Sequence, residues 1–139
     1  MDRLLIALGI AAAAALVAIV LRRRRHPDAP TRSIGLVPEQ LDRTDFATPE
    51  APWLVAVFTS ATCSTCADVV AKAEVLASAD VAVEAVEFQT RPDLHQRYRI
   101  EAVPLLVIAD GRGVVRGHFL GPVTATDLWA AVATARAEP

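Results

Sequence analysis

Residues 53–66 read WLVAVFTSATCSTC, an apolar run that leads directly into two closely spaced cysteines. The run from Trp53 to Thr59 is short, uncharged and rich in β-branched and aromatic residues, which is typical of a strand inside a sheet. Cys63 and Cys66 are the only cysteines of the chain. A framework of structural disulfides is therefore excluded, and a bridge across so small a loop would stabilise the chain little. We therefore interpret the two cysteines as a reactive site and not as a structural bridge.

Strand-like and helix-like segments alternate after this run. The predicted elements are a helix at 63–77, a strand at 81–88, a short helix at 91–98, strands at 104–109 and 113–119, and a helix at 124–137. The first strand, the helix and the second strand form a β-α-β unit, which implies two parallel strands. The turn Asp110-Gly111-Arg112 predicts an antiparallel hairpin. We therefore expect one α/β domain over residues 38–139 of this 139-residue chain.

The predicted start of the first helix gives Cys63 its chemistry. Free N–H groups and the positive end of a helix dipole stabilise a thiolate, so we expect the pKa of this thiol to lie below its free value of about 8.5. Thr62 or Ser60 is available as the helix cap. Cys66, three residues on, shares the same face of the first turn and can close a disulfide with Cys63. Cys63 is therefore the predicted nucleophile and Cys66 the resolving thiol.

Three short motifs together resemble the thioredoxin family: Cys63-Ser64-Thr65-Cys66 after a strand, Val103-Pro104 before the hairpin, and Gly121 before the last helix. The resemblance covers roughly residues 38–137. It implies a thioredoxin-like fold, with a central mixed sheet flanked by helices, and a thiol-disulfide oxidoreductase that uses the Cys63 and Cys66 couple without a separate cofactor or metal.

The same resemblance implies a substrate site and partners. The Val103-Pro104 bond would be cis and face the cysteines, and the backbone of Val103 would pair with a substrate peptide like an added strand. The predicted substrate-binding residues are Thr62, Val103, Pro104 and Gly121. The implied partners are protein disulfide substrates and a reductase or membrane electron donor that recycles the thiols.

The sequence also departs from the family pattern. The family usually has Trp before the first Cys, Gly-Pro between the two and a buried Asp below them, where this chain has Thr62, Ser64-Thr65 and Val57. The Lys that often accompanies the Asp is matched by Ala85. Since the intervening dipeptide tunes the redox potential, Ser64-Thr65 leaves the direction of electron flow open. The carboxylates that could replace the Asp as proton acceptor are Asp68, Glu84 and Glu87.

The amino-terminal segment predicts a membrane anchor. Residues 4–21 are eighteen uncharged residues, and a helix of this length spans about 27 Å, barely the thickness of a bilayer core. The basic flank Arg22–Arg25 argues against a cleaved signal peptide and, by the positive-inside rule, for a folded domain on the cytoplasmic face of the cell membrane. An extracytoplasmic domain is the alternative. Residues 22–37 read as a basic juxtamembrane tether.

The charge distribution argues against nucleic acid as a partner. Residues 38–139 carry eight Lys or Arg against fourteen Asp or Glu, whereas residues 1–37 carry six Arg against two Asp. An acidic domain presents no basic surface to a phosphate backbone. We therefore expect no nucleic acid partner.

Two other function classes stay open. A CxxC can form half of a zinc site, but there is no second CxxC, and the three histidines, His26, His95 and His118, are widely scattered. The second alternative is a membrane-tethered binding domain whose thiols are incidental. The large aromatic residues are predicted to lie in the core, namely Trp53, Phe58 and Trp129.

Overall fold

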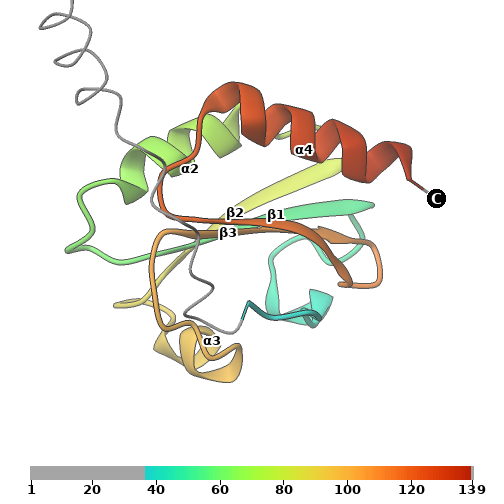
Figure 1. The fold of residues 1–139 in the computed structure, drawn as a ribbon. Helices are drawn as coiled ribbons and strands as arrows, with labels where there is room; N and C mark the ends of the chain where they lie inside the picture. The colour runs from blue at the N-terminus through green and yellow to red at the C-terminus, as the bar shows by residue number, and fades with distance from the viewer. Residues whose placement is uncertain (1–36, 139) are drawn as a thin grey trace, which may run out of the picture. The chain divides into compact units, whose positions relative to one another are not determined.

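The computed structural model describes residues 37–138, which form a four-stranded sheet with helices on both faces (Figure 1). In chain order the elements are the 3₁₀ helix η1 (Arg43–Asp45), β1 (Trp53–Thr59), α2 (Cys66–Glu74), β2 (Val81–Glu87), α3 (Pro92–Arg97), β3 (Leu105–Asp110), β4 (Val115–Leu120) and α4 (Ala125–Ala137). The strands follow the order β2-β1-β3-β4 across the sheet. The predicted α/β fold, a mixed sheet flanked by helices, is confirmed for these residues.

Strand β1 lies inside the sheet because both of its edges are paired. It runs parallel to β2, with Trp53 opposite Val81 and Thr59 opposite Glu87, and antiparallel to β3. The parallel pair confirms the predicted β-α-β unit, and β3 and β4 form the predicted antiparallel hairpin. Six of the seven β1 residues are buried. A strand covered on both faces has no place for a charged side chain, which explains the uniformly apolar run.

One core lies between the sheet and the pair of helices α2 and α4 (Figure 1). Val55 and Val57 of β1 point to this face, where they pack with Val69 of α2 and Leu128 of α4. Successive residues of a strand point to opposite faces, so β1 contributes every second side chain to this core. Trp53, predicted to be core, lies half-buried against it.

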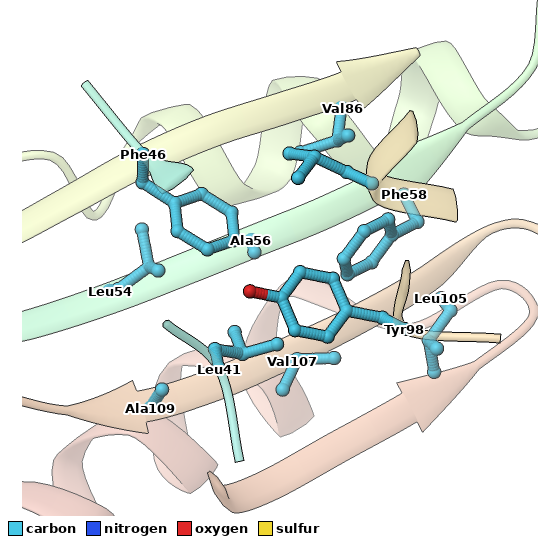
Figure 2. Packing of buried hydrophobic residues seen from close by; sticks show 11 residues of the cluster. Leu41, Phe46, Leu54, Ala56, Phe58, Val86, Tyr98, Leu105, Val107 and Ala109 are labelled. Atoms are coloured by element: carbon cyan, nitrogen blue, oxygen red, sulfur yellow. The ribbon is translucent and has the colours of Figure 1, made fainter. Parts of the chain in front are cut away.

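The core on the opposite face gathers around aromatic rings (Figure 2). Leu54 and Phe58 of β1 pack there with Phe46 and with Tyr98, which follows α3. The rings of Phe58 and Tyr98 meet edge to face, with centroids 6.2 Å apart. Phe58 is fully buried, as predicted. Burial of an aromatic side chain of this size stabilises the fold by about 1.5–3 kcal/mol.

The prediction that Trp129 lies in the core is wrong. The buried stripe of α4 runs through Leu128, Val132 and Ala135, a spacing that gives one helix face. Trp129 lies beside this stripe and is 42% exposed. Its indole N–H donates a hydrogen bond to the carbonyl of Lys72 at 3.3 Å, so the side chain lies across the outer surface of the helix pair.

The segment before β1 is fixed to the hairpin by backbone hydrogen bonds. The Leu41 N–H donates to the Gly113 carbonyl at 2.8 Å, and the Val115 N–H donates to the Glu39 carbonyl at 2.9 Å. Gly113 has φ +81°, and a Cβ there would lie 1.9 Å from the Leu41 carbonyl oxygen. Only glycine therefore fits at this close approach.

Among residues 37–138, no helix is long and apolar enough to cross a membrane. The predicted membrane span at 4–21 lies outside the described residues, as does nearly all of the basic tether at 22–37. Both stay predictions from the sequence.

Candidate functional site

Cys63 and Cys66 form a disulfide just beyond the carboxyl end of β1. The sulfur atoms are 2.17 Å apart and the Cα atoms 5.5 Å apart. Cys63 is half-buried, whereas Cys66 is only 4% exposed. Cys63 is therefore the more accessible of the two residues, as the predicted roles of nucleophile and resolving thiol require.

Helix α2 begins three residues later than predicted, at Cys66 instead of Cys63. Residues 60–63 form a turn in which the Cys63 N–H donates to the Ser60 carbonyl at 3.0 Å. The helix cap is Thr65, so the prediction of Thr62 or Ser60 as the cap is wrong. Ser and Thr side chains that hydrogen-bond the nearby backbone compete with helix formation, and here Ser60 Oγ accepts the Thr62 N–H at 3.4 Å. Cys63 thus precedes the helix.

The hydroxyl of Thr65 is a polar neighbour of the Cys63 sulfur that the sequence reasoning missed. Its Oγ1 atom lies 3.8 Å from Cys63 Sγ, close enough for a weak hydrogen bond to sulfur. In the reduced protein this hydroxyl is placed to donate to a Cys63 thiolate, and hydrogen bonding to the charged form favours it. The signal was a hydroxyl residue two positions after the first cysteine.

Pro104 and Gly121 lie at the same end of the sheet as the disulfide. Leu105, the first residue of β3, pairs with Phe58 near the end of β1 and with Leu120 at the end of β4. The Gly121 N–H donates to the Pro104 carbonyl at 2.8 Å. The Val103-Pro104 bond is cis, as expected. Three loops therefore meet at this end: the turn at residues 60–63 that carries Cys63, called the cysteine turn below, the segment before β3 and the segment after β4.

Thr62 and Val103, the other two predicted substrate-binding residues, have different environments. Thr62 is exposed in the cysteine turn, whereas Val103 is half-buried against the aromatic core. Substrate binding by these two residues, and by Pro104 and Gly121, stays a prediction.

A hollow of about 570 Å³ lies against the disulfide, on the α2 side of the sheet. Its wall includes both cysteines, apolar side chains such as Val70 and Ala85, and two carboxylates. The full lining is Thr59, Ser60, Ala61, Cys63, Cys66, Ala67, Val70, Ala71, Glu74, Ala85, Glu87 and Thr90. Where α2 and β2 face each other, the wall of the hollow is made of small residues, namely Ala67, Ala71 and Ala85.

Val57, at the position of the family's buried Asp, is fully buried in apolar surroundings. It pairs with Ala85 on β2, the position matched to the family's Lys. Neither residue titrates, so no charge lies at these two positions below the disulfide. Two carboxylates, those of Glu74 and Glu87, line the hollow together with the cysteines.

The histidines of the described residues lie in separate environments. His95 is buried, with Nε2 2.8 Å from the Val86 carbonyl oxygen, and its ring lies edge-on to Phe58 and Phe88. His118 is exposed on β4. Within residues 37–138, no group of three or more His, Cys, Asp or Glu side chains is placed to hold a metal ion.

Three solved structures are similar to this chain in fold. A mutant thioredoxin from Halobacterium salinarum is 22% identical, with a TM-score of 0.55, and the match covers 63% of this chain and 77% of that protein. Mitochondrial thioredoxin 3 from Saccharomyces cerevisiae, in its oxidised form, is 22% identical, with a TM-score of 0.52 and coverages of 62% and 81%. Trxlp from Edwardsiella tarda is 16% identical, with a TM-score of 0.54 and coverages of 67% and 95%.

The sequence matches no protein-family model and no curated protein. At these identities the structural likeness establishes the thioredoxin fold, and the chemistry has to be argued from the site.

Proposed function

We propose that this chain, which has the thioredoxin fold with a CxxC-spaced disulfide, is a thiol-disulfide oxidoreductase that reduces protein disulfides. The observation that carries the proposal is the Cys63–Cys66 disulfide just after β1, in which the first cysteine is half-buried and the second is buried. A bridge of sequence separation 3 adds little to stability, so its value lies in being made and broken.

The reaction has two sulfur exchanges. In the reduced protein the Cys63 thiolate attacks one sulfur of a substrate disulfide, which forms a mixed disulfide and releases the other substrate sulfur as a thiolate. Cys66 then attacks Cys63 Sγ, which restores the Cys63–Cys66 disulfide and releases the second substrate thiolate. Two electrons pass from the protein to the substrate. A thiol reductase or a membrane electron donor must return them for the next cycle.

The proposed location is a cell membrane, with the folded domain on the cytoplasmic face. The apolar span at 4–21 supports an anchor, and the four Arg that follow it support this orientation. Thiols are normally kept reduced in the cytoplasm, which suits a reductase. If the domain faces the other side, the same couple serves as an oxidase or reductant of exported proteins. A reporter fused after Pro139 that is active only after export separates the two orientations.

The test of the proposed function is a trapping experiment with two single variants of the full chain. Cys66→Ser removes the resolving thiol, so the mixed disulfide with the substrate should accumulate and be released by a reducing agent. Cys63→Ser is the matched control, because it also leaves one thiol but removes the accessible one. Trapping by Cys63→Ser alone would reverse the roles, and trapping by neither would refute the oxidoreductase.

A further inference from the structure

We propose that the carboxylate of Glu87 accepts the proton of Cys66 when this thiol resolves the mixed disulfide. The inference rests on the proposed function, because it names the proton acceptor for the second step of that reaction. A thiol attacks only as its thiolate, so Cys66 must lose a proton before it can reach Cys63 Sγ. A buried thiol in apolar surroundings loses it less readily than an exposed one.

Glu87 is on the face of β2 that borders the hollow. It is the last residue of β2 and is in register with Thr59, the last residue of β1. Val81 and Val83, at alternate positions of the same strand, belong to the core under α2 and α4. Since strand side chains alternate, Glu87 points to this same face. It lines the hollow together with both cysteines.

Hydrogen bonds hold the end of β2 next to the cysteine turn. The Phe88 N–H donates to the Thr59 carbonyl at 2.9 Å. Gln89 joins the same two segments twice, because its Oε1 accepts from the Ala61 N–H at 3.0 Å and its Nε2 donates to Ser60 Oγ at 3.2 Å. The backbone that carries Glu87 is therefore fixed to the backbone that leads into Cys63.

The other two carboxylates considered from the sequence are occupied elsewhere. Glu84 points to the opposite face of β2, where its Oε2 accepts the Ala47 N–H at 2.8 Å. Asp68 forms an ion pair with Lys72 at 2.6 Å on the exposed side of α2. Among residues 37–138, none of the ion pairs involves Glu87, so its carboxylate is available to accept a proton.

Glu74 also lines the hollow, but it is less well placed. It is exposed at the end of α2, eight residues after Cys66, which corresponds to roughly 12 Å along the helix axis. Glu87 is half-buried at the strand end beside the cysteine turn. The hollow of about 570 Å³ has room for several water molecules of roughly 30 Å³ each. The proton can therefore pass from Cys66 through water to the Glu87 carboxylate.

The resolving step moves one proton and exchanges one disulfide bond for another. Cys66 S–H gives its proton, through water, to the Glu87 carboxylate. The Cys66 thiolate attacks Cys63 Sγ, the bond between Cys63 and the substrate sulfur breaks, and the substrate leaves as a thiolate. That thiolate then takes a proton from solvent, and Glu87 returns its own proton to solvent. The two cysteines are oxidised, and the substrate disulfide is fully reduced.

A single rapid-mixing experiment with 5,5′-dithiobis(2-nitrobenzoate), a disulfide that releases a yellow thiolate when it is cleaved, follows both sulfur exchanges. Reduced full chain and an equimolar amount of reagent release one coloured thiolate when Cys63 attacks and a second when Cys66 resolves. The second step is intramolecular, so the charge of the reagent does not affect encounter. For Glu87→Gln we expect an unchanged first release and a second release slowed at least about tenfold at neutral pH, because positioned proton acceptors contribute about that much or more.

The pH profile separates proton acceptance from a merely structural effect. As the pH rises above about 8.5, the pKa of a free thiol, hydroxide increasingly removes the thiol proton without an acceptor. Because the Cys66 thiol is buried and loses its proton less readily, the defect of Glu87→Gln should shrink progressively with rising pH. Glu87→Asp, which keeps a carboxylate, should restore most of the rate. Glu84→Gln, on the opposite face of the same strand, should match the unaltered chain at every pH.

Three outcomes would overturn the proposal. The second release could be unchanged in Glu87→Gln, it could be slowed by the same factor at every pH, or Glu74→Gln could slow it as much. If the unaltered chain releases no second thiolate at all, the proposed function itself fails, and this result is distinguishable from the other three.

Discussion

Replacing Val57 with Asp tests whether the position below the disulfide is as dry as the structure indicates. The side chain is fully buried and packs in the apolar core under α2 and α4. An ionised carboxylate in such surroundings is disfavoured, so the pKa of the introduced group should lie well above about 3.9, the value for a free Asp. Val57→Asn is the matched control, since it has nearly the same shape and polarity but does not titrate.

The expected loss of stability has two parts. Both variants lose the burial of the Val side chain, which contributes about 1.5–3 kcal/mol, and both bury a polar group. Only Val57→Asp adds a term that depends on pH. A pKa raised by about three units corresponds to about 4 kcal/mol, at 1.36 kcal/mol for each unit.

The sign of this term follows from the raised pKa. The neutral carboxyl is the form that the folded state prefers, so the extra loss is absent at a pH below about 4. It grows as the pH rises toward about 7, where the folded-state carboxyl also ionises, and is constant above that pH.

The assay is guanidinium-induced unfolding of the oxidised full chain between about pH 4 and pH 8, with the free energies extrapolated to water. We expect the two variants to be similar at the acid end and to separate by about 4 kcal/mol at neutral pH. If raising the pH alone, without guanidinium, unfolds Val57→Asp, the pH-dependent loss exceeds the stability of this variant, which also supports the prediction. Equal stability of the two variants at every pH would show that solvent reaches position 57, and the dry site would be wrong.

Three further predictions concern the frame that holds the site. Phe58→Ala should destabilise the chain by about 3–5 kcal/mol in urea unfolding, and Phe88→Ala, at a position 50% exposed, by much less; similar losses would contradict the described core. Burial and a hydrogen bond to a carboxylate raise the pKa of Tyr98 to about 12, so its phenol should add stability that is present below pH 10 and lost as the pH rises toward 12; absorbance titration that finds an ordinary pKa would refute this. Burial alone would raise the pKa of Asp110, but the Arg116 guanidinium and two backbone N–H groups lower it overall. Acid unfolding should therefore occur at a lower pH in the unaltered chain than in Asp110→Asn.

The bounds of β1 could be predicted to the residue, because an uncharged run with β-branched side chains between polar segments has one good solution. The parallel β-α-β unit and the hairpin followed from connection rules. The start of α2 could not be predicted as well. The Ser60 hydroxyl accepts the Thr62 N–H, a local hydrogen bond that competes with the helix, and the outcome of that competition is not visible in a periodic pattern.

Residues brought together from distant parts of the chain were the hardest to predict. The sequence offered three carboxylates as candidate proton acceptors, those of Asp68, Glu84 and Glu87, with no way to choose among them. The register of β2 against β1 makes the choice, since it turns Glu87 toward the hollow and Glu84 away from it. The prediction that Trp129 lies in the core was wrong for another reason: Ala-rich α4 gives little contrast between its buried and its exposed face.

The central claim is that Cys63 and Cys66 form one reversible redox couple. Its most direct test is an equilibrium titration of the full chain in dithiothreitol and glutathione buffers of graded redox potential, followed by alkylation and mass measurement of the free thiols. We predict that both thiols appear together, in a single two-electron transition, and that the same curve is obtained from the oxidised and the reduced starting material. Two thiols that appear at separate potentials, or a disulfide that does not re-form after reduction, would contradict the account.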